Sequence, residues 1–223
     1  MCRQARTGGG IVSPGGPSGA PVVLASASPR RRELLQALVR AFEVREPQLD
    51  EVLGDDPVAD ARRLALAKAA AVAAGHPHAV VLGADTVVHD GRRHYGKPSS
   101  AEEAVAMLRA LRGREHTVVT GVAAVRDGQA WIGHSTVHVW LADLDDEAIA
   151  AYVASGRPMD KAGAYAIQDD DVPTVQRWQG CYCAVVGLPL WVACRALTAM
   201  GLHPDSPVAA YPRCAACPDR GDP

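Results

Sequence analysis

One acidic residue stands out because it interrupts an otherwise apolar run. Asp85 and Thr86 lie within LGADTVV, part of a predicted buried strand over 79–90. Burying an unpaired carboxylate costs on the order of several kcal/mol, so Asp85 must meet a cation, a metal ion or a water network. At this level a structural ion pair and a chemical role, such as activating water, explain Asp85 equally well.

A second polar motif, SASPRR, covers residues 26–31, where a predicted strand gives way to a helix. Ser28 followed by Pro29 has the pattern of an N-cap with proline in the first helical turn. Free amides at that end of the helix, with the guanidiniums of Arg30 and Arg31, would attract a polyphosphate. A capped helix with solvated arginines is the alternative, so spacing alone suggests an anion site without establishing it.

Three isolated lysines could supply further cations. Lys68 lies in the alanine-rich run ALAKAAAV, Lys97 lies between Gly96 and Pro98, and Lys161 lies in MDKAGAY. A lone lysine in such a helix either extends to solvent or points into a charged cleft. Each of the three is therefore a candidate phosphate ligand and equally a solvated side chain.

Two further features could serve a nucleotide site. The acidic pair Asp50-Glu51 could hold a hydrated Mg²⁺ that bridges phosphates, although a solvated loop edge explains it as well. Gln168 ends the run AGAYAIQ, and its amide could read the edge of a base or simply face water.

The histidines and cysteines predict no metal or redox site. The eight histidines lack metal-ligand spacing, and no Ser-His-Asp set is evident. Cys214-Ala-Ala-Cys217 has CxxC spacing without a second pair, which predicts free surface thiols. Six cysteines, two of them in a predicted tail, indicate reduced thiols in a cytoplasm.

Mixed elements must position these residues. Helices are predicted after Ser28, from Asp56-Pro57 to Ala74, and after Ser100, where Glu103 completes a capping-box spacing. Strands are predicted over 22–26 and 79–90 and as a hairpin around 127–128, and two further helices over 145–155 and 190–200. Residues 163–187 are predicted to be extended with a loop. The result is an α/β fold, a mixed sheet flanked by helices with a cleft between two lobes.

Length and charge narrow the class of protein. The 223 residues suit one domain over 21–202, with a disordered leader at 1–20 and a flexible tail at 203–223. The net charge of -2 and the 4% aromatic content disfavour nucleic acid as a partner. No apolar run is long enough to span a membrane, and the leader lacks the apolar core of a signal peptide.

Taken together, the motifs resemble the Maf family of nucleotide pyrophosphatases. The resemblance runs from about Val22 to Leu202 through LASASPRRRELL, the acidic pair, ALAKA, LGADTVV, GKP, DKAGAYAIQ and VVGLPL, in that order. It implies an elongated mixed sheet with a deep cleft, like that of inosine triphosphate pyrophosphatases, and often a homodimer. It also implies metal-dependent release of pyrophosphate from nucleoside triphosphates, with Mg²⁺ or Mn²⁺.

The resemblance assigns roles to particular residues. Asp85 becomes the proton acceptor, and Glu51 with Asp85 becomes the metal-binding pair. The phosphate-binding residues are Ser26, Arg31, Lys68 and Lys97.

Three positions resemble those that divide the family by base preference. Arg30, Thr86 and Gln168 match the branch that acts on dTTP and UTP, so the chain is expected to remove these or modified pyrimidine triphosphates from the nucleotide pool. The alternatives are the same chemistry on another base, such as 7-methyl-GTP, and a nucleotide-binding regulator of septum formation. One departure stands beside the base position: residues 169–171 are three aspartates, which could repel phosphate or recruit a cation.

Overall fold

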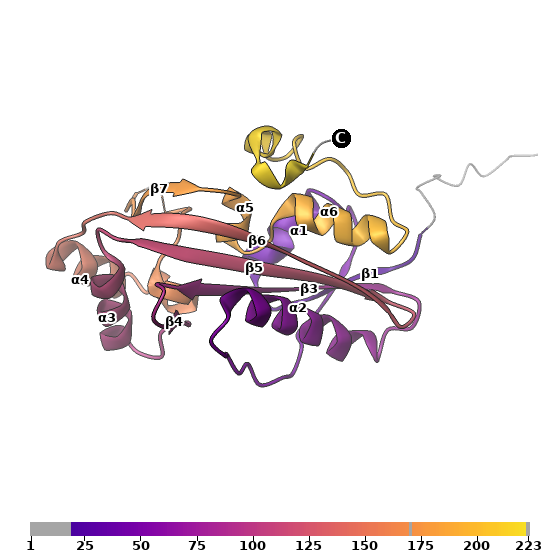
Figure 1. Ribbon diagram of the computed structural model, residues 1–223, viewed down its shortest axis with the longest axis horizontal. Helices are drawn as coiled ribbons and strands as arrows, with labels where there is room; N and C mark the ends of the chain where they lie inside the picture. The colour runs from indigo at the N-terminus through magenta and orange to yellow at the C-terminus, as the bar shows by residue number, and fades with distance from the viewer. Residues whose placement is uncertain (1–18, 170, 222–223) are drawn as a thin grey trace, which may run out of the picture.

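One long mixed sheet dominates the computed structural model, which describes residues 19–169 and 171–221. The strand order is β2-β1-β3-β5-β6-β7, with β4 paired to the far end of β3. Pairing is parallel around β1 and antiparallel from β3 to β7. The predicted mixed sheet flanked by helices is confirmed (Figure 1). The strands are β1 (Val22–Ala25), β2 (Glu43–Arg45), β3 (Val80–His89), β4 (His94–Tyr95), β5 (Glu115–Arg126), β6 (Gln129–Leu141) and β7 (Val175–Gln179).

The helices cover the two faces of the sheet unequally. Because side chains alternate along a strand, Val81 and Ala123 face α2, whereas Leu82 and Val122 face the larger core that α1, α3, α5 and α6 share. The helices are α1 (Pro29–Gln36), α2 (Pro57–Ala73), α3 (Ala101–Leu111), α4 (Asp146–Ala154), α5 (Tyr182–Val186) and α6 (Leu190–Ala199).

The predicted helix starts are confirmed by their caps. The Ser28 hydroxyl accepts from Arg31 N at the start of α1, and the Asp56 carboxylate accepts from two amides at the start of α2. Ser100 caps α3 in the same way, but the Glu103 carboxylate accepts from Ser99 N rather than from Ser100 N. The local signals therefore place the beginnings of these three helices correctly.

Two glycines let α2 approach the sheet closely. A Cβ at Gly83 would lie 2.3 Å from the Ala65 carbonyl oxygen, and one at Gly121 would lie 2.1 Å from the Ala61 carbonyl oxygen. A larger residue cannot occupy either position without moving the helix. This contact brings Lys68, one turn beyond Ala65, to the sheet.

The edge of β3 is open at one point, and there the cleft forms. β1 pairs with β3 only as far as Gly83, and β4 joins the same edge only at Val88. Within the described residues no strand pairs with the stretch between them on that edge. Asp85 on one face of β3 and Thr86 on the other can therefore both reach the same opening.

The region 163–187 is more structured than the extended loop that the sequence predicts. It contains the short 3-10 helix η2 (Ala162–Ala164), strand β7 and helix α5. α5 has only five residues, too few for a periodic pattern, and strand β2, with the sequence EVR, escapes detection for the same reason.

The segment predicted as a flexible tail, residues 203–223, contains short helices in its described part. Residues up to 221 form two 3-10 helices, η3 (Pro212–Ala216) and η4 (Pro218–Arg220), which pack near α5 and α6 (Figure 1). Trp191 Nε1 donates to the Cys214 carbonyl oxygen at 2.9 Å. Cys214 is 2% exposed, so it is not the surface thiol that the sequence predicts. Such long-range contacts leave no local pattern, and the proline-rich composition hides them.

The remaining predictions on organisation fall partly outside the structure. The leader at 1–20 lies outside the described residues except for its last two positions. No described helix combines the length and apolar character that crossing a bilayer requires.

Candidate active site

A cleft of about 480 Å³ opens beside the uncovered edge of β3. Its walls come from the start of α1, the loop before α2, strand β3, the loop after β4, the segment 160–168 and the end of α5. Segments far apart in the sequence thus meet at one opening. Eight of the nine predicted site residues line it: Arg30, Arg31, Glu51, Lys68, Asp85, Thr86, Lys97 and Gln168.

Lys68 joins the two carboxylates that were predicted to bind metal. Its Nζ donates to Asp85 Oδ1 at 2.5 Å and lies 2.6 Å from Glu51 Oε1. The side chains of Lys68 and Asp85 are 8% and 7% exposed, whereas that of Glu51 is 53% exposed. Lys68 therefore does not extend to solvent, and Asp85 has the cation that its burial requires.

The loop that carries Glu51 is anchored to α2. Asp60, which is 5% exposed, accepts from Gly54 N at 2.6 Å and from Arg63 at 2.7 Å. Arg63 also donates to the Val52 carbonyl oxygen. The buried Asp60 thus holds the loop that carries Glu51 against α2. No sequence signal singled it out, since an acid in the first turn of a helix has an ordinary explanation in the helix dipole.

Arg31 is held in the cleft by three hydrogen bonds to neutral oxygens. Its guanidinium donates to the Gly187 carbonyl oxygen at 2.9 Å, to Ser26 Oγ at 3.3 Å and to Thr86 Oγ1 at 3.1 Å. Burial lowers the pKa of Arg31, and the nearby carboxylates of Asp85 and Glu51 oppose that shift. Such a preoriented guanidinium suits an anionic ligand.

Ser26 supports this arginine rather than lining the cleft. The residue is 4% exposed, and its hydroxyl accepts from Ser28 N at 3.2 Å as well as from Arg31. It is absent from the lining of the cleft. Its place differs from that of the other predicted phosphate ligands.

A directional chain of hydroxyl groups continues from Arg31 into the core. Thr120 Oγ1 donates to the Ala184 carbonyl oxygen at 2.7 Å, so its only proton is used. The hydroxyl of Thr86, 3.0 Å away, must then donate to Thr120 while it accepts from Arg31. Thr86 is therefore tied to the arginine that faces the phosphate-binding side of the cleft.

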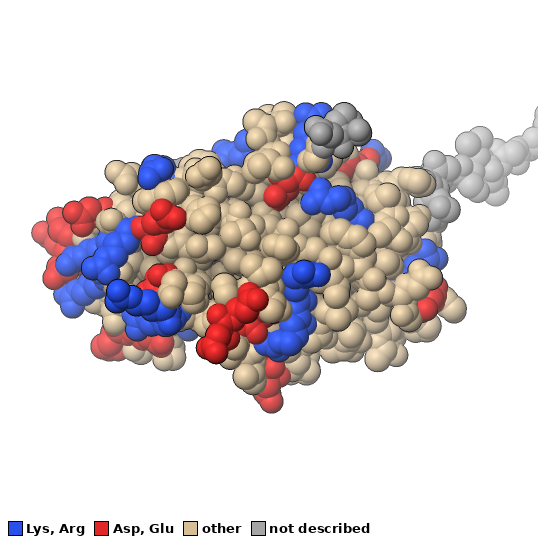
Figure 2. All heavy atoms as spheres, in the orientation of Figure 1, with Lys and Arg blue, Asp and Glu red and all other residues tan. Residues whose placement is uncertain are grey.

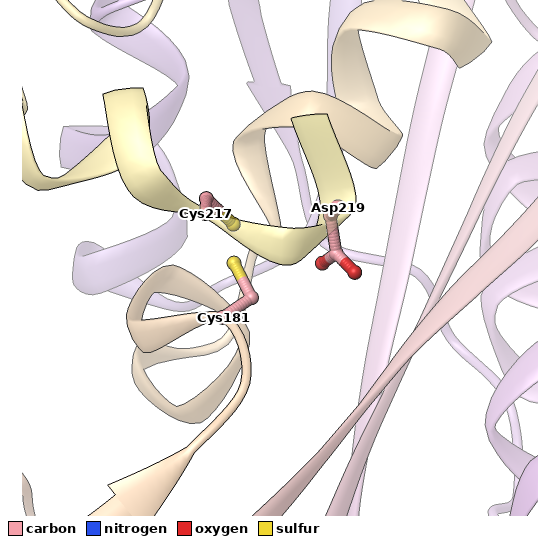
Figure 3. Close-up of side chains that lie close together, drawn as sticks. All are labelled: Cys181, Cys217 and Asp219. Carbon is pink, nitrogen blue, oxygen red and sulfur yellow. The ribbon is translucent and has the colours of Figure 1, made fainter. Parts of the chain in front are cut away.

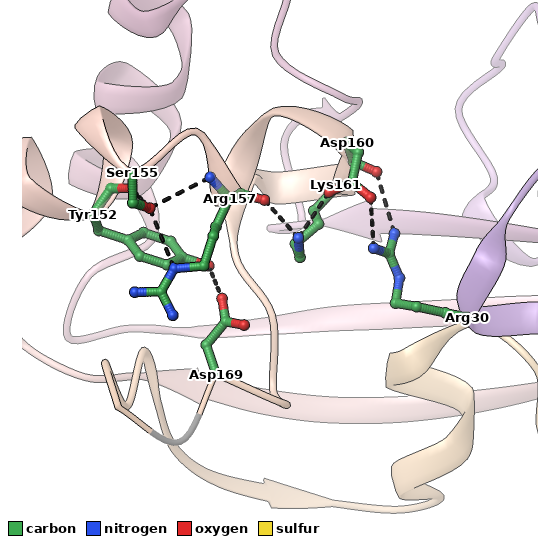
Figure 4. A network of polar contacts seen from close by, with 7 residues as sticks. All are labelled: Arg30, Tyr152, Ser155, Arg157, Asp160, Lys161 and Asp169. Carbon is green, nitrogen blue, oxygen red and sulfur yellow. Dashed lines mark hydrogen bonds and ion pairs between the residues drawn. The ribbon is translucent and has the colours of Figure 1, made fainter. Parts of the chain in front are cut away.

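Arg30 and Lys161 share one carboxylate (Figure 4). Arg30 donates to Asp160 Oδ2 at 2.7 Å, and Lys161 Nζ donates to Asp160 Oδ1 at 2.7 Å. Lys161 also donates to the Arg157 carbonyl oxygen at 2.5 Å. Asp160, in the 3-10 helix η1 (Arg157–Asp160), thus closes one wall of the cleft and holds Arg30 against it.

The acidic loop has its own partners away from the cleft. Asp169 accepts from the Tyr152 hydroxyl at 2.5 Å, and Asp171 pairs with Arg157 at 2.6 Å. Figure 4 shows Asp169 directed toward Tyr152. Neither acid lines the cleft, so the expected repulsion of phosphate has no basis at these two positions; residue 170 lies outside the described residues.

Lys97 and Gln168 are exposed at the cleft wall. Among the described residues neither side chain has a polar partner, so both can turn toward a ligand. Between them Tyr165 forms part of the wall, and its hydroxyl lies 2.6 Å from Nε2 of the buried His116. This pair escapes sequence reasoning because the partners are 49 residues apart.

These observations define an α/β protein with a cation-lined cleft for an anionic ligand. Residues 21–200 match the Maf-like protein family, and the chain belongs to that family. A dTTP/UTP pyrophosphatase of Thermomicrobium roseum is 49% identical over 202 residues, covering 88% of this chain and 93% of the relative. One of Symbiobacterium thermophilum is 46% identical over 182 residues, covering 81% and 94%.

Solved structures are more distant. The Ham1 protein of Staphylococcus aureus is 19% identical and covers 55% of this chain and 72% of its own, with a TM-score of 0.40. That similarity is too low to carry an argument about the site.

Proposed function

We propose that this protein hydrolyses dTTP and UTP, including modified pyrimidine forms, to the monophosphate and pyrophosphate. The observation that carries the proposal is the buried ion pair of Lys68 and Asp85 at the floor of a cleft that also holds Arg31. Relatives that share nearly half of their residues with this chain bear the name dTTP/UTP pyrophosphatase.

Fixed and mobile cations are expected to bind different parts of the triphosphate. Arg31 and Lys68 lie at fixed positions, and each retains donors beyond those used within the protein. Lys97, at the rim, is free to close on the outer phosphates. Positive charge around the phosphates stabilises the oxygens that gain charge in the transition state. Ser26 contributes by orienting Arg31.

Asp85 acts as the base in this proposal. A water oxygen bonds to the α-phosphorus as the bond from that phosphorus to the bridging oxygen breaks, and pyrophosphate leaves. The water proton passes to Asp85, whose neighbour Lys68 holds the carboxylate in place. A base and an aligned water suffice, because phosphoryl transfer depends mainly on positioning and electrostatics.

The donor set fits a hard divalent cation. Carboxylate oxygens are the protein ligands that Mg²⁺ and Mn²⁺ prefer, and those of Glu51 and Asp85 are near enough to share one lysine ammonium. When bound, such an ion supplies positive charge to the phosphate oxygens and makes the attacking water more acidic. Asp50 does not line the cleft and is left out of this set.

Base selection is assigned to Arg30, Thr86 and Gln168. Gln168 is the member whose amide lines the cleft without a polar partner among the described residues, and it offers both a donor and an acceptor. Arg30 is held by Asp160, and Thr86 acts through Arg31. Gln168 is therefore expected to contact the base directly, with Arg30 shaping the same wall.

A panel of nucleoside triphosphates, assayed with Mg²⁺ or Mn²⁺ and with separate detection of pyrophosphate and phosphate, tests the activity. Turnover of dTTP and UTP with release of pyrophosphate is the expected result. Preference for a purine would contradict the base assignment, and release of phosphate alone would contradict the site of cleavage. Asp85→Asn tests the mechanism, because pyrophosphate release that survives this change would remove Asp85 from the role of base.

The proposal also covers the cellular compartment and the oligomeric state. We place the enzyme in the cytoplasm, as a homodimer that binds nucleotides and neither nucleic acid nor membranes. In its support, the described cysteines form no disulfide, and acidic and basic side chains intermix on the face in Figure 2 without a continuous basic stripe. Light scattering tests the dimer. Binding of dTTP by the wild type without hydrolysis would favour the regulator of septum formation instead.

A further inference from the structure

Two pairs of cysteines, distant in the sequence, meet beneath the C-terminal segment. Cys181 and Cys183 lie at the start of α5, and Cys214 and Cys217 lie in and after η3. All four line a small pocket of about 170 Å³. The CxxC motif therefore has the second pair that it lacks in the sequence, supplied by Gly180-Cys181-Tyr182-Cys183.

The thiols are arranged as ligands rather than as isolated side chains. Cys183 Sγ lies 3.8 Å from Cys214 Sγ, so these two thiols are in direct contact. The Cys181 thiol forms hydrogen bonds with both Cys183 and Cys217. Cys181, Cys183 and Cys214 are each at most 2% exposed.

A carboxylate provides an independent indication of a cation. One oxygen of Asp219, Oδ2, is buried and has no hydrogen-bond partner among the described residues. Ligand atoms of Asp219, Cys181 and Cys217 all lie within 4.8 Å of one another. Figure 3 shows these three side chains converging from the start of α5 and from the C-terminal segment. A buried carboxylate oxygen without a hydrogen bond is costly unless a positive charge compensates it.

We propose that these residues form a structural zinc site distinct from the active site. Cys181, Cys217 and Asp219 provide three ligands, and a thiol of the Cys183–Cys214 pair provides the fourth. Thiolates select a soft or borderline cation such as Zn²⁺ over the Mg²⁺ that suits Glu51 and Asp85. The fourth ligand requires a rotation about the Cα–Cβ bond of Cys183 or Cys214 that turns its sulfur toward the other three ligands. Arg213, which also lines the pocket, offsets the negative charge of the thiolates.

The site connects the C-terminal segment to the catalytic cleft. Helix α5 begins at this cluster and ends beside Gly187, whose carbonyl oxygen holds Arg31, and the Ala184 carbonyl oxygen within α5 holds Thr120. Zinc at the start of α5 would therefore fasten the helix that orients the phosphate-binding arginine. Loss of the ion is expected to reduce stability and to raise the KM for the triphosphate more than it lowers kcat.

Elemental analysis of the full-length wild type, purified without added metal, tests the site. About one zinc per chain is expected, and it should remain after dialysis against a mild chelator that removes Mg²⁺. Cys181→Ser, Cys217→Ser and the double change Cys183→Ser with Cys214→Ser should each lose it. Cys194→Ser is the matched control, because Cys194 lies outside the cluster and should retain full zinc.

Three outcomes overturn the proposal. The first is wild type without zinc that also binds none on titration with Zn²⁺. The second is a denatured, unreduced chain with four fewer reactive thiols than its six cysteines, since this would show two disulfides. The third is Asp219→Asn with unchanged zinc affinity, against an expected loss of about tenfold or more. Because Asp219→Asn removes no sulfur, it serves if the cysteine variants fail to fold; zinc affinity is measured by competition with a coloured chelator.

Discussion

Lys68 Nζ lies 2.5 Å from Asp85 Oδ1, and both side chains are more than nine-tenths buried. Lys68 thus pairs with the buried Asp85. Its ammonium also lies 2.6 Å from a second carboxylate, that of Glu51. The lysine neutralises the buried acid when substrate is absent. Its position at the cleft allows the remaining ammonium proton to meet a phosphate oxygen.

Removing this lysine should cost more than removing a surface partner. Lys68→Met leaves Asp85 buried without its cation, so the free energy of unfolding should fall by about 3–5 kcal/mol. The control is Arg109→Met, which breaks an exposed pair with Asp146 and should cost far less. Urea denaturation of both variants measures the difference, and equal losses would contradict a buried pair.

A single methyl group at Gly121 should move α2. Its Cβ would lie 2.1 Å from the Ala61 carbonyl oxygen, so Gly121→Ala should destabilise the fold by roughly 1–3 kcal/mol or more and displace Lys68 from Asp85. Gly75→Ala is the control at the end of the same helix, where the nearest atom would be 3.9 Å away. Thermal unfolding and kcat are measured together. A Gly121→Ala variant with wild-type values for both would show that the close approach does not matter.

The hydroxyl chain below Arg31 should affect substrate affinity. Thr120→Val keeps the shape of the side chain but leaves the Ala184 carbonyl oxygen and the Thr86 hydroxyl without this partner, at a cost of about 1–3 kcal/mol. Because Thr86, which bonds Arg31, loses the acceptor that orients its hydroxyl, KM for dTTP should rise while kcat changes less. Thr136→Val, at an exposed position of β6, should leave both parameters unchanged. A fall in kcat alone would place Thr120 elsewhere in the mechanism.

His116 should make stability sensitive to acid. Burial lowers its pKa from 6.5 to about 4, so the folded protein keeps the imidazole neutral where the unfolded chain is already protonated. Above about pH 6.5 the imidazole is neutral in both states and does not affect stability. As the pH falls from about 6.5 to about 4, the free energy of unfolding should decrease by roughly 3 kcal/mol, because only the unfolded chain gains the proton.

The pH dependence of the unfolding free energy, compared between wild type and His116→Gln, isolates this contribution from that of the carboxylates. The difference between the two curves should change between pH 6.5 and 4. His134→Gln, at an exposed histidine, should follow the wild type throughout. Parallel curves for wild type and His116→Gln would show that His116 is not responsible.

Gln168 should control base choice without affecting chemistry on the phosphates. Gln168→Ala removes the amide that faces the cleft, so discrimination between UTP and CTP should fall by roughly tenfold, the effect of about 1.4 kcal/mol. Values of kcat/KM for the two nucleotides give the ratio, and Asp169→Asn is the control because Asp169 is bonded to Tyr152 outside the cleft. An unchanged ratio in Gln168→Ala would assign selection to other residues.

Residues that act locally could be predicted from the sequence. Ser28, Asp56 and Ser100 cap their helices as expected, because a cap depends on groups within three residues of it. The anomalous position of Asp85 in an apolar strand was visible for a similar reason, since burial follows from the run around it. The order of motifs then identified the family.

Other features depend on which segments meet, and the sequence alone could not decide them. Ser26 lies behind Arg31 although its motif places it beside the helix N-terminus. Asp169 accepts a hydrogen bond from the Tyr152 hydroxyl, and Asp171 forms an ion pair with Arg157. In each case the partner comes from a different element, and no local periodicity encodes the contact.

By itself, the sequence determined the α/β class, the beginnings of α1, α2 and α3 and the inventory of charged residues, because these follow from local pattern and composition. Only the tertiary structure decided that Lys68 bonds Asp85 and that Cys181 lies beside Cys217. Both contacts depend on close packing between distant segments: α2 against the glycines of the sheet, and the C-terminal segment against α5. The free energy of such packing is shared among many residues, so it leaves no signature at the positions that it brings together.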